Sequence, residues 1–409
     1  MSSARRQLEG AELLDRIRLV GEAFRPAAPT DRRDLFAGRT EQIGELFAVL
    51  AQPGQHAVIY GERGVGKTSL ATVSAQMIRS SNVLVARTTC DASDGFGSVW
   101  RKALDEIVIR TETRGVGFVP AAGEAVNPAS RLLAAEPVTP HVVRKALSSV
   151  TQQREIVVFV DEFDRLADHE ARTLFADTIK LLSDQLVGAT IVLVGVADDI
   201  DELIREHASV ERALVQIHMP RMSRDELAEI VTRGMAAAQM TIGKSAVERI
   251  ATLSQGLPHY THLLGQHAAQ AALDAGRTDV TLSDVDRAVR RAIDRAQRSI
   301  MDAYQRATES GRRSLPQVLL ASALAEEDEF GFFSAADVRE RLSRITGKEQ
   351  PAASFAQHLD ELADPDRGPV LQKRGAPRRF RYRFVNPLLQ PYVVMRGLSE
   401  GTVNAKGLR

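Results

Sequence analysis

The eight residues 61–68, of sequence GERGVGKT, constrain this chain more than any other stretch. They match the pattern G-x-x-x-x-G-K-[ST] at each of its specified positions. Residues 57–60 predict a short buried strand before the pattern, and residues 69–73 predict the start of a helix after it. A strand, a glycine-rich loop and a helix in this order surround an anion with backbone N–H groups and with the positive end of a helix dipole. The stretch therefore predicts a nucleotide phosphate site.

Two loop residues have specific predicted roles. Lys67 is expected to reach the β- and γ-phosphates, and the Thr68 hydroxyl is expected to bind Mg²⁺. The predicted cofactors are therefore ATP or ADP with Mg²⁺. The other loop residues predicted to contact the nucleotide are Gly61, Glu62, Arg63, Gly64, Val65, Gly66 and Ser69. The alternative is a plain glycine-rich turn between a strand and a helix.

The amino-acid composition limits the classes of protein to which this chain can belong. With 409 residues the chain is long for a single hydrophobic core, so two or three domains are expected. Its 53 Lys and Arg residues balance its 53 Asp and Glu residues, so any basic surface must be local. The single cysteine, Cys90, excludes an internal disulfide and a cysteine-based zinc site. The N-terminus shows no apolar signal core, and the longest apolar run, residues 186–197, is shorter than the roughly 20 residues of a membrane span. These features predict a soluble cytoplasmic protein without a membrane partner.

Several elements around the loop follow from periodicity. Helices are predicted over about 7–20, 40–50 and 96–110, and a strand over 82–87. Arg39 precedes the second of these helices, either as an exposed residue of a helix-entry turn or as a residue that shapes the adenine or ribose side of the site. Residues 115–140 are rich in Gly, Pro and Ala with little periodicity. They predict a mobile loop or a partner-binding insertion.

A second group of candidate residues follows the apolar stretch 156–160, of sequence IVVFV. This run is too short for a helix and rich in β-branched residues, which predicts a central parallel strand. Ligands of open α/β sheets lie at the carboxyl ends of the strands, where Asp161 and Glu162 stand. Asp161 is predicted to hold Mg²⁺, and Glu162 to orient and polarise the attacking water. The alternative is an acid pair that opens a helix over residues 164–174.

Two further strands are predicted over 190–196 and 215–219. Asp198 follows the first of them and is a candidate for sensing the γ-phosphate or its water. The alternative is that Asp198 caps a short helix predicted over 199–207. Strands alternate with helices from residue 57 to residue 219, which predicts an α/β fold with a parallel sheet.

Residues 221–310 predict helices without strands. Ser223 and Glu226 fit the capping-box pattern that opens a helix extending to about residue 240. Further helices are predicted over 245–253, 258–275 and 283–310. This part is expected to be a small helical domain, with Pro258 and His259 at the start of its third helix.

The C-terminal part predicts three helices, over 315–325, 334–345 and 352–362, followed by a β-hairpin over 369–385. This is the element order of a winged helix. In the second hairpin strand basic residues alternate with aromatic residues, so one face is basic and the other packs on the core. The candidate residues for contact with duplex DNA are Lys373, Arg374, Arg378, Arg379, Arg381 and Arg383. The alternative is a solvated wing that does not bind DNA.

The order of these features resembles the AAA+ ATPases of the origin-recognition and replication-initiator clade over roughly residues 25–395. The resemblance implies that residues 61–68 are the Walker A loop and that residues 157–162 are Walker B with its catalytic acid. It places Asp198 at the sensor 1 position and Arg212 at an arginine that acts on a neighbouring subunit's nucleotide. The implied catalytic residues are Lys67, Glu162, Asp198 and Arg212. The implied domains are an N-terminal helical arm and linker (1–34), a P-loop ATPase core (35–220), an all-α lid (221–310), a winged helix (311–398) and a flexible tail (399–409).

Two departures from that clade matter. Its sensor 1 residue is usually Asn or Thr, whereas this chain has Asp198. Its sensor 2 helix normally presents an arginine, whereas this chain has Pro258 and His259. The tripeptide Gly-Leu-Pro at 256–258 is similar to the G-x-P motif of STAND signalling ATPases, in which the proline meets the adenine. The departures favour slow ATP hydrolysis and a switch over a fast motor.

Three hypotheses for function remain open. In the first, nucleotide orders a homo-oligomer and the winged helix binds duplex DNA. In the second, the chain is a STAND-like regulatory switch in stress or antiphage signalling, and its winged helix locks the closed state or binds a protein effector. In the third, it is a target-selecting ATPase of a transposition system.

Overall fold

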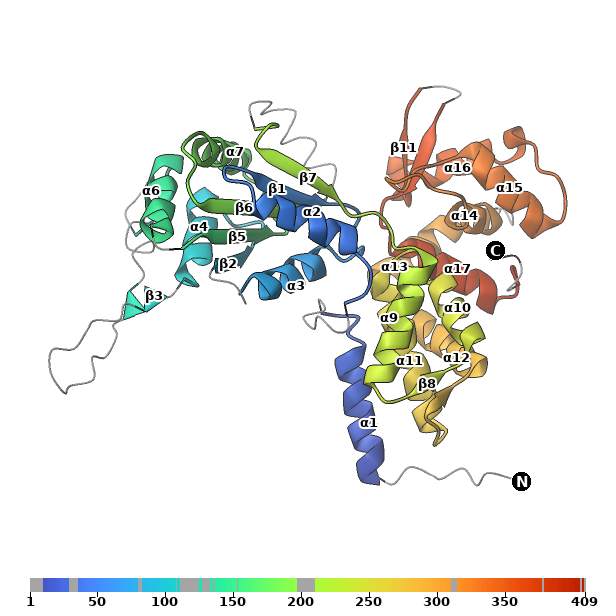
Figure 1. Ribbon diagram of the computed structural model, residues 1–409. Helices are drawn as coiled ribbons and strands as arrows, with labels where there is room; N and C mark the ends of the chain where they lie inside the picture. Colours follow the sequence, from blue (N-terminus) through green and yellow to red (C-terminus); the bar gives the residue numbers. More distant parts are fainter. Residues whose placement is uncertain are drawn as a thin grey trace. The chain divides into compact units, whose positions relative to one another are not determined.

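The computed structural model describes residues 10–28, 36–79, 83–107, 109–110, 125–126, 133–134, 137–152, 154–196, 210–309, 315–376, 379–404 and 407. The chain divides into two compact units. The first, called the sheet unit below, comprises Arg39–Gly61 and Lys67–Met219. The second, called the helical unit, comprises Met1–Gly38, Glu62–Gly66 and Pro220–Arg409 (Figure 1). Within the described residues, no helix is long and apolar enough to cross a membrane.

The sheet unit is built on five strands whose hydrogen-bonded neighbours are all parallel. Their order across the sheet is β2-β5-β6-β1-β7, with β1 His56–Tyr60, β2 Leu84–Thr89, β5 Ile156–Asp161, β6 Ala189–Gly195 and β7 Leu214–His218. The predicted α/β fold with a parallel sheet is confirmed. A separate antiparallel pair joins β3 Ile109–Arg110 to β4 Ala125–Val126. Most of the predicted 115–140 loop lies outside the described residues.

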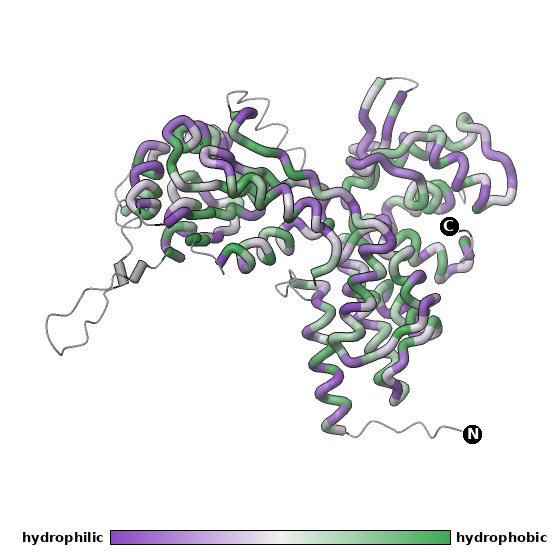
Figure 2. Tube along the Cα trace, in the orientation of Figure 1, coloured by the Kyte–Doolittle hydropathy of each residue, from purple (hydrophilic) through white to green (hydrophobic). Residues whose placement is uncertain are grey.

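Both faces of the sheet are covered, which explains why its three central strands, β5, β6 and β1, are largely apolar. Ile156, Val158 and Val160 of β5 join the core under the helices on one face, whereas Val157 and Phe159 are buried on the opposite face. The central strands are accordingly hydrophobic in Figure 2. The helices of this unit are α2 Thr40–Leu50, α3 Lys67–Arg79, α4 Phe96–Asp105, α6 Pro140–Thr151 and α7 His169–Asp184.

Two helix predictions in the sheet unit differ from the structure, and one helix was not predicted. The predicted helix 96–110 ends at Asp105. The predicted helix 164–174 is wrong in its start, because only a 3₁₀ turn forms at Phe163–Arg165 and α7 begins at His169. The cap of α7 is Asp168, whose side chain accepts a hydrogen bond from the Glu170 N–H at 3.0 Å. Helix α6 was not predicted.

The helical unit begins with α1 Gly10–Ala23, which packs on α9 Arg224–Ala237 and α11 Pro258–Asp274. The capping box that opens α9 is confirmed, because Ser223 and Glu226 exchange side-chain and backbone hydrogen bonds. The single long helix predicted over 283–310 is wrong. It divides into α12 Leu282–Asp294 and α13 Arg298–Thr308. This part also contains α10 Lys244–Leu253. The expectation of helices without strands over 221–310 is wrong, because β8 Thr241–Ile242 and β9 Asp279–Val280 form a short parallel pair.

The C-terminal part of the helical unit has the predicted winged-helix elements. Its helices are α14 Leu315–Ala323, α15 Ala335–Thr346 and α16 Ala356–Leu362, and its sheet has the order β10-β12-β11, with β10 Phe333–Ser334, β11 Leu371–Arg374 and β12 Arg381–Phe384. The predicted alternation in β12 is confirmed, since Tyr382 and Phe384 are buried and Arg381 is exposed. Helix α17, Leu389–Ser399, follows the hairpin and was not predicted.

Candidate functional site

The carboxyl end of β1 and the start of α3 hold the first part of the candidate site. Gly61 follows β1 in an extended backbone with φ of 155°, and a β-carbon there would lie 2.4 Å from the Met219 carbonyl oxygen. Only glycine allows this close approach. The Lys67 Nζ donates a hydrogen bond to the Gly61 carbonyl oxygen at 2.9 Å. The side chain of Lys67 is therefore turned back over the loop to which it belongs.

The structure brings together the two residues predicted to bind a metal. The Thr68 hydroxyl at the start of α3 donates to Asp161 Oδ1 at 3.3 Å, although 93 residues separate them in the chain. Strand β6 lies between β1 and β5, so the bond joins groups that follow strands two places apart in the sheet. Parallel strands end at the same edge, which is why residues so distant in sequence meet here.

Asp161 is buried and has two hydrogen-bond donors that carry no charge. The Glu162 N–H donates to its Oδ1 at 2.9 Å, beside the bond from Thr68. Burial raises the pKa of the Asp161 carboxyl, and these two bonds oppose part of the rise. A hydroxyl and a carboxylate are the hard oxygen donors that Mg²⁺ prefers. The described residues include no group of three or more His, Cys, Asp or Glu that could hold a metal. The pair therefore fits Mg²⁺ that takes its other ligands from phosphate and water.

Glu162 has an unusual backbone. Its φ of 51° lies in the left-handed region, which few non-glycine residues occupy. The side chain does not cap the following 3₁₀ turn, and Asp168 caps α7, so the interpretation of residues 161 and 162 as a helix-capping pair is wrong. Glu162 Oε2 instead accepts a hydrogen bond from Arg165 Nη1 at 2.9 Å, and both side chains are about half exposed.

The middle of the loop, Glu62–Gly66, belongs to the helical unit. A β-carbon at Gly66 would lie 3.8 Å from Pro258 Cγ, so the predicted lid proline stands beside the loop. The next residue, His259, donates from Nδ1–H to the Pro26 carbonyl oxygen at 2.8 Å. Burial lowers the pKa of His259, the bond to Pro26 opposes this, and the charge of Arg63 lowers the pKa further. Pro258 thus lies beside the loop, and His259 is close enough to Arg63 of the loop to be affected by its charge.

The other predicted site residues are placed as follows. Arg39 stands at the start of α2 with a left-handed backbone, and only 4% of it is exposed, so the alternative of an exposed arginine is wrong. Its role toward adenine or ribose stays a prediction. Arg212 is exposed in the turn before β7, and Val65 and Ser69 lie in the loop and in α3. Asp198 and Arg378 lie outside the described residues.

The structure also shows a cluster that the sequence did not predict. Arg221, between β7 and α9, donates from Nε to Glu62 Oε2 at 2.6 Å. Its Nη1 pairs with Glu327 Oε2 at 3.0 Å and also donates to the Gln390 side-chain oxygen. No local pattern could have revealed it, because Glu62 stands at a position where the loop pattern accepts any residue.

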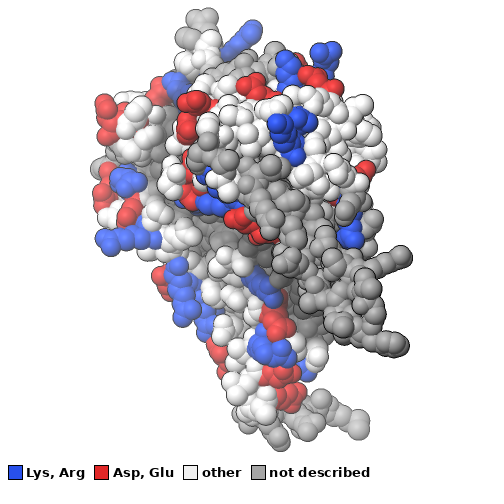
Figure 3. Space-filling view, turned by 90° about the vertical axis from the view of Figure 1, so that its left-hand side faces the viewer, with Lys and Arg blue, Asp and Glu red and all other residues white. Residues whose placement is uncertain are grey.

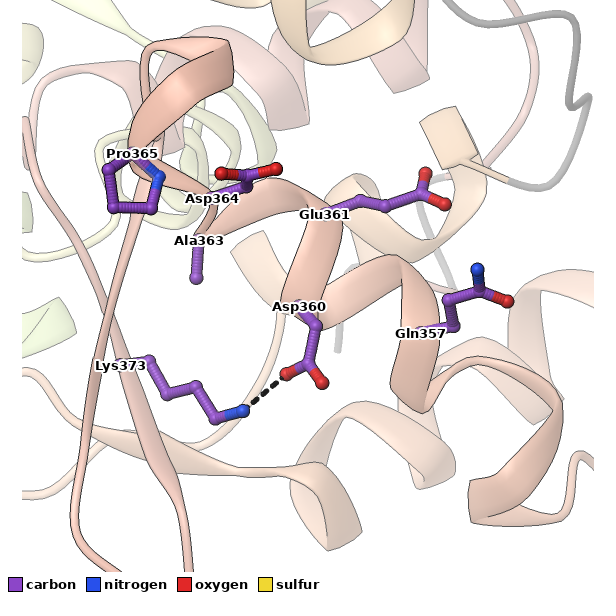
Figure 4. Close-up of a pocket in the computed structure, with 7 residues that line it drawn as sticks. All are labelled: Gln357, Asp360, Glu361, Ala363, Asp364, Pro365 and Lys373. Carbon is purple, nitrogen blue, oxygen red and sulfur yellow. Dashed lines mark hydrogen bonds and ion pairs between the residues drawn. The ribbon is translucent and has the colours of Figure 1, made fainter.

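Several basic residues of the wing are already paired within the helical unit. Lys373 Nζ lies 2.6 Å from Asp360 Oδ1, and Arg381 Nη2 lies 3.0 Å from Asp328 Oδ2. Figure 4 shows Lys373 of β11 pointing toward Asp360 of α16 across a pocket of about 330 Å³. The pocket is lined by Gln357, Asp360, Glu361, Ala363, Asp364, Pro365 and Lys373. Elsewhere on the molecule, on the face drawn in Figure 3, which is the left-hand side of Figure 1, basic and acidic side chains are interspersed. Among the wing arginines, Arg374, Arg379 and Arg381 are exposed.

A parallel sheet with a glycine-rich phosphate loop after β1 and a carboxylate at the end of β5 defines a P-loop nucleoside triphosphatase of the AAA+-like kind. Residues 23–367 match the model of the family described as Novel STAND NTPase 1. The chain belongs to this family. Comparison with curated protein sequences finds no match.

Several solved structures are similar to this chain. The Walker-type ATPase PABY2304 of Pyrococcus abyssi is 15% identical, with a TM-score of 0.53, and the alignment covers 90% of this chain and 98% of that chain. The Aeropyrum pernix ORC1 protein, solved in complex with DNA, is 17% identical with a TM-score of 0.48, over 93% of this chain and 96% of that chain. The Aeropyrum pernix ORC2 protein is 14% identical with a TM-score of 0.49, over the same shares.

Proposed function

We propose that this chain is an ATP-dependent conformational switch that hydrolyses ATP slowly and whose winged helix restrains the phosphate loop. One observation carries the proposal: Glu62–Gly66 packs within the helical unit. A β-carbon at Gly64 would lie 3.1 Å from Leu388 Cδ2, just before α17, and 3.9 Å from Leu257 Cδ2. The loop that we propose to bind phosphate is thus in contact with a residue of the winged helix. Any movement of the loop on nucleotide exchange acts on these contacts.

The chemistry of the switch follows from the sheet unit. Lys67 neutralises charge on the phosphates, and the backbone N–H groups of the loop hold their oxygens. Thr68 and Asp161 hold Mg²⁺, which when bound neutralises charge on the transferring phosphoryl group. Glu162 orients the attacking water and accepts its proton. Hydrolysis is slow because Glu162 is held by Arg165 and the start of α11 presents Pro258 and His259 where an arginine would stabilise the transition state.

The mass of the intact chain in solution tests this function. With ADP we expect a monomer, and with a slow ATP analogue and Mg²⁺ a change in assembly or in hydrodynamic size. Lys67→Ala should abolish the difference, whereas Lys145→Ala, at an exposed position on α6, should retain it. Identical behaviour of the wild-type chain in both nucleotides, each at saturation, would contradict the proposed switch.

Duplex DNA is the second candidate partner, and the exposed Arg379 and Arg381 favour it. Against it, α16 carries Asp360 and Glu361 but neither Lys nor Arg, which disfavours contact with phosphates. If all six basic wing residues met phosphates, the log–log slope of affinity against salt would be about −5. Reversal of Arg379, Arg381 and Arg383 to Glu should abolish binding to DNA if the wing binds it. If these three substitutions leave the affinity for duplex DNA unchanged, the wing does not bind DNA.

A further inference from the structure

The cluster around Arg221 joins four segments of the helical unit. Arg221 precedes α9, Glu62 lies in the loop, Glu327 lies between α14 and β10, and Gln390 lies in α17. Arg221 Nη1 also donates to the Gln255 carbonyl oxygen at 3.2 Å. The exposed fractions of the side chains are 16% for Arg221 and 11% for each carboxylate. A single guanidinium therefore holds the loop and the winged helix at the same time.

The segment that carries Glu327 packs closely against Glu62 of the loop. Gly331 has φ of 77°, and a β-carbon at this position would lie 2.2 Å from Glu62 Oε1. The Asp328 side chain accepts hydrogen bonds from the N–H groups of Phe330 and Phe332, which orders the turn. Gln390 in turn donates from Nε2 to the Ala323 carbonyl oxygen at 3.0 Å. The turn between α14 and β10 thus encloses the side chain of Glu62.

The charges of the cluster make it sensitive to loss of the arginine. Two largely buried carboxylates, Glu62 and Glu327, share one guanidinium. Removing one member of a buried ion pair leaves an uncompensated charge, which costs more than the pair itself contributes. Without Arg221, the two carboxylates would also repel each other. The cluster therefore holds only while all its members stay in place.

We propose that Arg221 is a positioning residue that couples nucleotide exchange at the phosphate loop to release of the winged helix. Displacement of Glu62 breaks one side of the cluster, and displacement of Glu327 breaks the other. By linkage, a partner that draws the winged helix away also weakens the binding of ADP at the loop. We expect this loss of affinity as faster release of ADP, because most differences in affinity lie in the dissociation rate. This inference rests on the proposed switch and names the residue that transmits it.

The test is the dissociation rate of a fluorescent ADP from the intact chain. Arg221→Gln should release ADP about tenfold faster, within the usual range of coupling between sites. Adding Glu327→Gln to Arg221→Gln should restore slower release, because it removes the repulsion between carboxylates. The free energy of unfolding of both variants, measured alongside, separates this effect from a general loss of stability. Should Arg221→Gln fail to fold, Glu62→Ala removes the loop side of the cluster alone and should also speed release.

Arg277→Gln provides the matched control. Arg277 lies in the same unit, its side chain is 12% exposed, and it pairs with buried Asp284 at 2.7 Å away from the loop. It should leave ADP release within about twofold of wild type. Release from Arg221→Gln no faster than from Arg277→Gln would overturn the inference. Failure of the proposed switch is distinguishable, since the wild-type chain itself would then respond identically to ADP and to the ATP analogue.

Discussion

Each unit contains a buried carboxylate, and the two differ in what neutralises them. Asp161 of the sheet unit accepts hydrogen bonds from an N–H group and a hydroxyl, both without charge. Glu327 of the helical unit pairs with the guanidinium of Arg221. Burial raises the pKa of both, and raises that of Glu327 to about 7. Asp161 is thus arranged to receive a cation, whereas Glu327 already has one within the chain.

The two carboxylates are therefore expected to have separate roles, Asp161 in ATP hydrolysis and Glu327 in the control of nucleotide exchange. We expect substitutions beside Asp161 to change catalysis and dependence on Mg²⁺ while leaving the Arg221 cluster intact. Substitutions beside Glu327 should change nucleotide exchange and its dependence on pH while leaving the chemical step intact. The four predictions that follow test this separation.

The largest effect is expected for Glu162→Gln. Loss of the base should lower ATP turnover by on the order of 10²–10⁴-fold, with retention of ATP binding. Phosphate release under saturating ATP measures it. Glu155→Gln, at an exposed position just before β5, whereas Glu162 directly follows β5, is the matched control and should turn over normally. Normal turnover in Glu162→Gln would exclude Glu162 as the residue that activates water.

Mg²⁺ is expected to increase the affinity for nucleotide, and Asp161→Asn should reduce this increase by at least about tenfold. The free energy of unfolding should not fall, because the variant removes a buried carboxylate without a paired cation. Titration of nucleotide with and without Mg²⁺, alongside denaturant unfolding, gives both quantities. If Glu327→Gln abolished the Mg²⁺ effect equally, the distinction between the two carboxylates would fail.

Release of ADP should depend on pH through Glu327. The groups that face this carboxyl are Arg221, whose charge lowers its pKa, Glu62 and Asp328, whose charges raise it, and Gln390, whose hydrogen bond lowers it. Because its pKa in the closed cluster is raised to about 7, protonation stabilises that state, and this contribution is lost as pH rises through 7. Release should therefore be roughly fivefold faster at pH 8 than at pH 6. In Glu327→Gln the rate should be independent of pH over this range, and a persisting dependence would assign it to another group.

The smallest effect is expected for Arg165→Ala. An ion pair between half-exposed side chains contributes no more than about 1 kcal/mol, so freeing Glu162 should raise turnover by less than about threefold. Steady-state phosphate release measures the change. A large loss of turnover would instead make Arg165 part of the catalytic machinery.

The sequence predicted the parts of the site that local patterns encode. The loop residues, the strand before Asp161 and the capping box at Ser223 each depend on neighbours within a few positions. Arg221 was not predicted because its partners lie 159 residues before it and 169 residues after it. Only tertiary structure brings such groups together.

The errors in the helix predictions have a similar cause. The acidic stretch before α7 contains several residues able to cap a helix, and the structure uses Asp168 in preference to Asp164. The helical spacing of apolar residues continues across residues 283–310. The helix nevertheless ends at Asp294, and a second helix begins at Arg298. The apolar spacing predicts which face is buried but does not locate such a break.

Amide hydrogen exchange of the intact chain tests the central claim most directly. It should be measured with saturating ADP and with a slow ATP analogue plus Mg²⁺, following Glu62–Gly66, the turn between α14 and β10, and α17. The account predicts that the analogue slows exchange in the loop and speeds it in the turn and in α17, and that Arg221→Gln gives the faster exchange in both nucleotides. Equal exchange in the turn and in α17 with either nucleotide would contradict a switch in which the winged helix restrains the loop.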